Sequence, residues 1–158
     1  MLVFAILIYA AAMTLANLSV AAFGPAVTPI NAFVLIGLDL ALRDFLHVRL
    51  KAWQMGLLIG ATGGLTYVLN PAAGMIAVAS ACAFSAAALA DWATFARLRG
   101  PWIRRANVSN VVGAAVDSLL FPTIAFGALL PHIVAMQFVA KVAGGALWAW
   151  LLKRRFAL

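Results

Sequence analysis

The chain has 158 residues, of which 66% are hydrophobic and 9% are charged, and its mean hydropathy is +1.08. Soluble globular domains carry about one-quarter charged residues, so this composition excludes a soluble fold and indicates an integral membrane protein. The net charge of +7 comes from basic residues at the ends of apolar runs, a pattern that argues against a nucleic-acid-binding surface. The single cysteine, Cys82, excludes disulfides within the chain and cysteine-based zinc sites.

Six apolar segments follow one another along the chain, separated by short connections. A helix needs about 20 apolar residues to cross the hydrocarbon of a bilayer. The six segments are approximately Leu2–Phe23, Val27–Leu46, Gln54–Leu69, Ala72–Phe95, Asn107–Phe126 and Ile133–Leu152. We therefore predict an all-α membrane protein, a single bundle of six transmembrane helices that forms one domain over residues 1–158. The run GATGG at Gly60–Gly64 would allow close helix packing or local unwinding in the third segment.

The basic residues predict the orientation of this bundle. Lys and Arg follow the second, fourth and sixth segments, whereas the connections after the first, third and fifth segments hold none. Ten of the eleven basic residues fall on one side if Arg43, near the end of the second segment, is counted there, and the eleventh is Lys141 inside the sixth segment. By the positive-inside rule, both termini are predicted to lie in the cytoplasm.

The acidic residues are four aspartates that all lie in or beside apolar segments: Asp39, Asp44, Asp91 and Asp117. An ionised carboxylate in hydrocarbon is costly, so such a residue is a functional candidate. Asp117 and Lys141 each lie twelve residues from Leu129, at the centre of the last connection. In an antiparallel helix hairpin the two side chains reach similar depth, which predicts an ion pair. The pair is either structural, fixing the register of the helices, or the charged centre of a transport site.

Two further aspartates have nearby basic residues. Asp39 and Arg43 are spaced i, i+4 and share one face of the second segment. Arg43 is long enough to extend toward the interface, whereas Asp39 lies too deep to reach water and is the stronger functional candidate. Asp91 either has a role of its own or pairs with Arg97 or Arg99 at the membrane surface.

Signatures of catalysis do not occur in the sequence. H-E-x-x-H, G-x-S-x-G, a glycine-rich phosphate loop and a cluster of His, Cys and Glu are all missing. We predict that the protein is not an enzyme, and that it has no cofactor and no metal site. His132, beside Pro131 in a short connection, is predicted to be exposed.

Several stretches together resemble one family. They are Ala16-Asn17, NAFVLIGLDLALR from Asn31 to Arg43, ADWATFARLR from Ala90 to Arg99, Trp102, SNVVGAAVDSLLFPTIAF from Ser109 to Phe126, and the lone Lys141. Their order is similar to that of the queuosine precursor transporters, the vitamin uptake transporter family of bacterial inner-membrane proteins. The chain departs from the family pattern at Leu38, where the family usually has Thr, and after Arg43, where a glycine is expected.

The resemblance implies an inner-membrane carrier that takes up 7-cyano-7-deazaguanine or a related 7-deazapurine for tRNA modification. A deazaguanine keeps the guanine edge with two adjacent N–H donors, which a carboxylate can accept, and aromatic side chains can stack on its rings. We expect Asp39 to accept the substrate, and Asp117 with Lys141 to form the charge-compensated centre. The candidate substrate-binding or transport residues are Asn17, Phe33, Asp39, Arg43, Asp91, Ser109, Asn110, Asp117, Phe121 and Lys141.

Two other functions stay open at this point. The substrate-binding subunit of an energy-coupling-factor vitamin importer also has six helices and small-residue motifs, here Ala12-x-x-x-Ala16. Alternatively, the protein is a membrane scaffold without transport, in which every polar pair is structural. The sequence also leaves open the preferred deazapurine, the coupling ion and whether the chain forms homo-oligomers.

Overall fold

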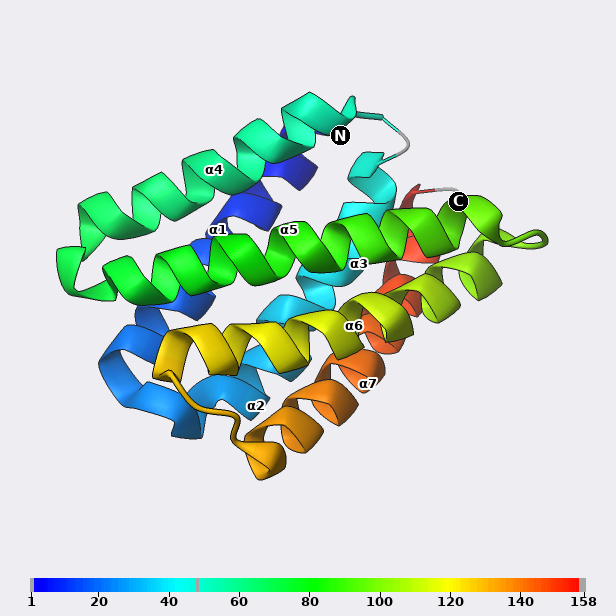
Figure 1. Cartoon of the computed structure of the whole chain (residues 1–158). Coiled ribbons are helices and arrows are strands. Elements are labelled where there is room, and N and C mark those ends of the chain that lie inside the picture. The colour runs from blue at the N-terminus through cyan, green and yellow to red at the C-terminus, as the bar shows by residue number, and fades with distance from the viewer. Residues whose placement is uncertain (1, 48, 157–158) are drawn as a thin grey trace.

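A computed structural model describes residues 2–47 and 49–156, except for the side chains of residues 44, 47, 52 and 153–156. In the described part the chain is helical apart from short connections, and it contains no β-strand. The helices are α1 (Leu2–Phe23), α2 (Thr28–Asn31), α3 (Gly37–His47), α4 (Ala52–Leu69), α5 (Gly74–Arg97), α6 (Trp102–Phe126) and α7 (Pro131–Phe156). They form one bundle in which α5 and α6 run side by side and α7 packs against α3 and α6 (Figure 1).

The first two predicted segments form a helical hairpin. After α1 the chain reverses at Gly24, whose φ of +68° is the left-handed conformation that glycine adopts readily at a helix end. A short 3₁₀ turn, Gly24–Val27, leads into α2, where Pro29 occupies the first turn and loses no hydrogen bond. A π-helical stretch, Ala32–Ile36, joins α2 to α3, so the second predicted segment is continuous but irregular. Such π turns often mark functional sites.

Four stretches of the described chain are long and apolar enough to cross a membrane: Leu2–Arg43, Pro71–Arg97, Trp102–Phe126 and Pro131–Leu152. The first has 42 residues and contains the helical hairpin, so it is long enough for two crossings. Helix α4 does not appear among the four. The all-helical membrane fold is thus as predicted, whereas the count of six crossings and the cytoplasmic position of both termini stay predictions.

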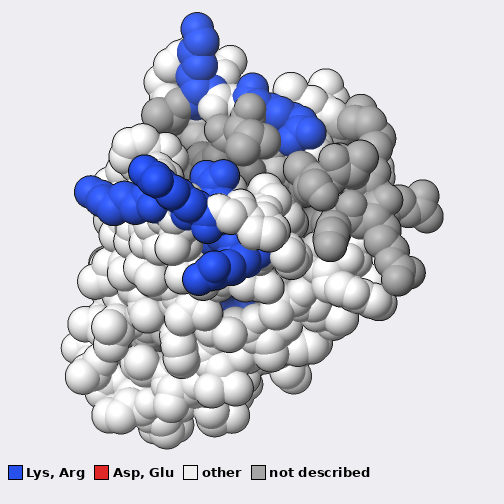
Figure 2. Space-filling view, turned by 90° about the vertical axis from the view of Figure 1, so that its right-hand side faces the viewer, with Lys and Arg blue, Asp and Glu red and all other residues white. Residues whose placement is uncertain are grey.

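The basic residues gather at one end of the bundle. The connection from α3 to α4 and the connection from α5 to α6 lie at this end, as do the two ends of the chain (Figure 1). Figure 2 shows Lys and Arg gathered in the upper part of one face, with no described acidic residue in view. The side chains of Asp44, Lys153, Arg154 and Arg155 lie outside the described residues. The gathering agrees with the charge pattern on which the predicted orientation rests.

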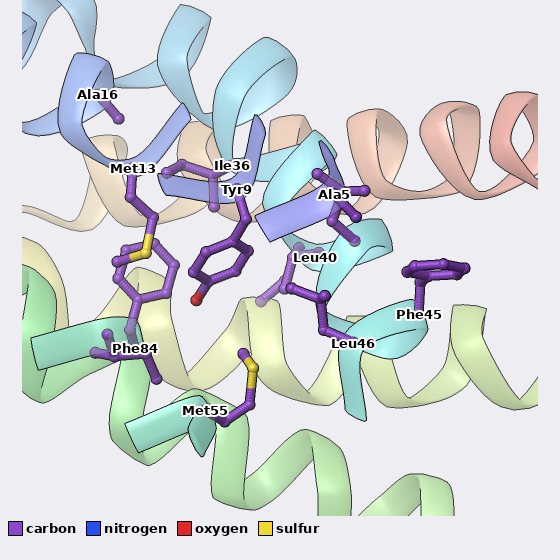
Figure 3. Packing of buried hydrophobic residues seen from close by; sticks show 13 residues of the cluster. Ala5, Tyr9, Met13, Ala16, Ile36, Leu40, Phe45, Leu46, Met55 and Phe84 are labelled. Carbon is purple, nitrogen blue, oxygen red and sulfur yellow. The ribbon is translucent and has the colours of Figure 1, made fainter. Parts of the chain in front are cut away.

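Buried apolar side chains, most of them from α1, α3, α4 and α5, form the hydrophobic core (Figure 3). Tyr9 lies at its centre with no exposed surface, and its hydroxyl points inward among Leu40, Phe84 and Met55. A buried hydroxyl normally finds a hydrogen-bond partner. The charged groups beside the Tyr9 hydroxyl are those of Asp39 and Arg43 in α3.

Among the glycines of the described chain, Gly37 and Gly144 have the closest backbone neighbours, where α7 crosses the π-helical stretch and the start of α3. A Cβ atom on Gly144 would lie 2.1 Å from the carbonyl oxygen of Phe33, and one on Gly37 would lie 2.6 Å from the carbonyl carbon of Gly144. By contrast, α4 is a regular helix, and a Cβ on Gly60 or Gly64 would meet nothing within 4 Å. The run at Gly60–Gly64 thus uses neither possibility, because Gly60 and Gly64 face away from the bundle and a Cβ on Gly63 would make only ordinary contact with Ala81 of α5, at 3.9 Å.

Candidate functional site

An ion pair links α6 to α7 in the interior of the bundle. The Nζ atom of Lys141 lies 2.6 Å from Oδ2 of Asp117, which confirms the contact predicted from their matching depth. The ammonium group also donates to Oε1 of Gln137 at 2.8 Å and to Oγ of Ser118 at 3.2 Å. These three contacts match the three N–H donors of a lysine. Lys141 is 1% exposed, so the pair is held in one place by its surroundings.

A proline lies one turn beyond this pair. Pro122 is inside α6 and is buried. Because proline has no N–H, the carbonyl of Ser118, four residues earlier, loses its helical hydrogen bond. Ser118 also contacts Lys141 through its hydroxyl. The fifth predicted segment thus places a carboxylate, a hydroxyl and a freed carbonyl within two adjacent residues of one helix.

A second ion pair lies within α3. Nη2 of Arg43 donates to Oδ2 of Asp39 at 2.6 Å, and the two residues are 1% and 0% exposed. Arg43 also lies over the ring of Phe84, with its guanidinium carbon 5.2 Å from the ring centroid. The hydroxyl of Tyr9 is close enough to interact electrostatically with both members of the pair. Arg43 therefore does not extend to the interface, the behaviour that its length alone would allow.

The two ion pairs belong to one buried electrostatic cluster. Besides Asp39, Arg43 interacts with the carboxylates of Asp91 and Asp117. Asp91 has no exposed surface and lies among these buried charges. Arg97 is exposed and donates to the backbone of its own helix, at Ala93. Charges from α3, α5, α6 and α7 thus meet in the interior.

A narrow cavity adjoins the pair between α6 and α7. It lies between α1, α2, the π-helical stretch, α5, α6 and α7, and its volume is about 30 Å³, room for about two water molecules. Asp117 and Lys141 line it, as do the rings of Phe84 and Phe121. The lining reaches Thr28, close to the turn Gly24–Val27. That turn is at the end of the bundle opposite the basic residues (Figure 1).

The amide side chains around the cavity provide both acceptors and a donor. The amide nitrogens of Asn17 and Asn31 donate to protein groups, Thr66 and Ser19 among them, which leaves their oxygens as acceptors. Gln137 has the opposite arrangement, because its oxygen accepts from Lys141 while its Nε2 has no hydrogen-bond partner among the described residues. Gln137 is 2% exposed. A buried donor without a partner is costly, and this one belongs to a residue that lines the cavity.

The structure separates the predicted site residues into two groups. Asn17, Asp117, Phe121 and Lys141 line the cavity. The others do not line it. Asp39, Arg43 and Asp91 belong to the buried charge cluster, and Ser109 and Asn110 are buried in α6, where Ser109 donates to its own helix at Ala106. Phe33 is 38% exposed and does not line this cavity. His132 is exposed, as predicted.

Several lining residues were not among the predicted candidates. They are chiefly Asn31, Ser80, Phe84 and Gln137. Gln137 lies one helical turn before Lys141, and Asn31 is the first residue of the motif that ends at Arg43. Closeness in the sequence to a predicted site residue could therefore have identified both. Ser80 and Phe84 lie in a run dominated by alanine, where nothing in the sequence distinguishes them.

A bundle of membrane-spanning helices with paired charges in its interior and a mainly apolar cavity with a few polar groups beside them is the architecture of a membrane transport protein. The comparison with protein families agrees. Residues 1–153 match the family described as "Putative vitamin uptake transporter". The chain belongs to this family, as its motifs suggested. No curated protein and no solved structure matches the chain.

One motif considered for a different class of transporter is buried. Ala12 and Ala16 are each 4% exposed, so the Ala12-x-x-x-Ala16 face of α1 packs against other helices of the same chain. This face is therefore not available in the structure for docking an ATPase module.

Proposed function

We propose that the protein is an uptake carrier of the bacterial inner membrane for 7-deazapurine precursors of queuosine, such as 7-cyano-7-deazaguanine. The observation that carries the proposal is the cavity beside the Asp117–Lys141 pair, which combines a carboxylate, amide groups and two phenylalanine rings. The family match supports transport of a small molecule. The choice of a deazapurine rests on the motif resemblance and on the chemistry of the cavity.

The groups of the cavity complement a guanine-like edge. Two adjacent N–H donors of the ligand would face the Asp117 carboxylate, which has lone pairs left after accepting from Lys141. The unpartnered Nε2 of Gln137 would donate to an acceptor on the ligand. Phe84 and Phe121 would cover the faces of the ring system. In this assignment the ligand contact moves from Asp39 to Asp117.

The narrowness of the cavity indicates a transport cycle in which helices move. At about 30 Å³ it is too small for a two-ring base, so α6 and α7 must separate from α1 and α2 to admit the ligand. The lining of the cavity reaches Thr28, beside the turn at the end opposite the basic residues, which the positive-inside rule places outside the cytoplasm. With both termini in the cytoplasm, a ligand would enter from the periplasmic side.

Uptake of labelled 7-cyano-7-deazaguanine tests this proposal in bacterial cells that neither make nor import the compound. We expect uptake with the wild-type chain and its loss in Asp117→Asn at an equal amount of protein in the membrane. Phe33→Ala is the control, because Phe33 does not line the cavity. Uptake no higher than in cells with an empty vector would overturn the proposal. Uptake only on co-expression of an ATPase module would favour the energy-coupling-factor class.

A further inference from the structure

Asn110 is a buried amide that makes no hydrogen bond among the described residues. It is 2% exposed, and both its Nδ2 and its Oδ1 are without a partner. The other two buried asparagines of the described chain, Asn17 and Asn31, each use the amide nitrogen to hold a neighbouring helix. A buried donor and a buried acceptor that stay unpaired are costly. A residue that breaks this rule with both of its groups is a candidate for binding a ligand.

Asn110 lies on the same helix as the Asp117–Lys141 pair but nearer to the basic end of the bundle. Asn110 precedes Asp117 in α6 by seven residues, two helical turns on one face, which separates them by about 10 Å along the axis. On α7, Gly145 follows Lys141 by one turn, and a Cβ on Gly145 would lie 3.8 Å from Nδ2 of Asn110. The seam between α6 and α7 thus holds the ion pair and, further toward the basic end, an unpaired amide.

A second amide continues this line along α6. Asn107 precedes Asn110 by three residues, and its buried Oδ1 also has no hydrogen-bond partner in the described part of the chain. Asn107, Asn110 and Asp117 share one face of the helix, because their spacing of three and seven residues follows the helical repeat. The polar groups therefore form a line that leads from the ion pair toward the basic end.

The amide of Asn110 can recognise a different edge of the base from the one that suits a carboxylate. A carboxylate only accepts, so Asp117 suits two adjacent N–H donors. An asparagine side chain has a donor beside an acceptor and can pair with a base edge through both at once. A 7-deazaguanine presents such an edge, a ring N–H next to a carbonyl. The separation of about 10 Å means that the base would meet Asp117 and Asn110 one after the other.

We propose that Asn110 is a second contact for the ligand, on the cytoplasmic side of the ion pair, which the base meets as it leaves the carrier. This inference rests on the proposed carrier function. In the described structure the amide lies against α7 at Gly145, with Leu40 of α3 packed beside it. The base reaches Asn110 only after α7 moves away from α6. The cavity and Asn110 are then the outer and inner contacts of one path.

The reactivity of a cysteine at this position tests the proposal in membrane vesicles. Cys82 is the only cysteine, so Cys82→Ser gives a chain without thiols. In this background Asn110→Cys should react with a membrane-impermeant maleimide added from the cytoplasmic side, because the reaction needs a thiolate that water reaches. Addition of 7-cyano-7-deazaguanine should abolish the reaction. Ser109→Cys is the matched control, since Ser109 is equally buried but donates to its own helix, and Lys51→Cys, exposed at the basic end, reports the orientation of the vesicles.

The outcomes separate the inner contact from the carrier function. Counterflow, the exchange of labelled for unlabelled 7-cyano-7-deazaguanine without a gradient, reports the carrier function by itself, and its absence in the Cys82→Ser protein would overturn that function. With counterflow present, an Asn110→Cys that reacts from neither side, or only from the side opposite Lys51→Cys, would overturn the inner contact. Equal reaction of Ser109→Cys would show a general opening of α6 and would overturn it too.

A leucine at the same position gives an independent measurement, which decides if Asn110→Cys does not fold. Asn110→Leu has a similar volume and removes two unpaired groups, so the unfolding midpoint should rise by roughly 2–12 °C. The maximal rate of uptake should nevertheless fall by roughly fivefold or more, without a rise in KM, because the outer cavity is unchanged. A lower midpoint together with an unchanged maximal rate would make Asn110 structural and overturn the proposal.

Discussion

Replacement of Gly144 by alanine tests the crossing of α7 over the π-helical stretch. The added Cβ would lie 2.1 Å from the carbonyl oxygen and 2.9 Å from the carbonyl carbon of Phe33. These are backbone atoms that cannot rotate aside, so the two helices must separate by more than about 1 Å. Overpacking of this kind costs about 1–3 kcal/mol or more. For a chain of this length that lowers the unfolding midpoint by roughly 2–12 °C.

The neighbouring glycine is a matched control. A Cβ on Gly145 would lie 3.7 Å from the nearest atom, the Cδ1 of Leu40, which is ordinary contact. Alanine there should be neutral or stabilise the helix by about 0.5–1 kcal/mol, because glycine is a poor helix former. Thermal unfolding of the purified variants in detergent measures the difference. Equal midpoints for Gly144→Ala and Gly145→Ala would refute the close crossing.

Three further predictions concern charge, cavity and outer face. Lys141→Met leaves Asp117 buried without its partner and should destabilise the protein by about 3–5 kcal/mol. The double variant with Asp117→Asn should regain most of the lost stability in unfolding experiments but should not regain uptake. An unchanged unfolding midpoint in Lys141→Met would contradict a buried ion pair. Gln137→Leu removes the Nε2 donor that has no partner among the described residues. It should raise the KM for uptake by roughly fivefold or more, because the ligand acceptor left without a donor costs about 1–3 kcal/mol. An unchanged KM would show that the ligand binds elsewhere. Gly60→Ala should not lower the unfolding midpoint, because nothing lies within 4 Å of the added Cβ, and a clear loss of stability would show that α4 packs on that face.

The ion pair between α6 and α7 shows which features of a site can be predicted from sequence. Asp117 and Lys141 are spaced symmetrically about a turn, so antiparallel geometry alone brings them to one depth. The contact of 2.6 Å follows from that register. The helical fold is predictable for a similar reason, because composition and the length of apolar runs determine it.

The cavity and the π-helical stretch were not predictable in the same way. The face that each helix turns inward depends on how it packs, and in a chain rich in alanine the two faces look alike. Gly60 and Gly144 illustrate this, since both belong to glycine-rich runs but only Gly144 lies at a helix crossing. Asp39 and Asp117 are likewise similar in sequence, and only the packing places Asp117 at the cavity and Asp39 inside the charge cluster.

Binding of 7-cyano-7-deazaguanine to the purified protein tests the central claim most directly. The claim is that this chain by itself holds the base in the cavity beside Asp117, between the rings of Phe84 and Phe121. Equilibrium titration in detergent should give saturable binding to wild type and to Phe33→Ala, and binding weaker by roughly tenfold in Phe121→Ala, since a stacked ring contributes about 1–3 kcal/mol. Absence of binding to the folded wild-type protein, or equal affinity in Phe121→Ala, would contradict the claim.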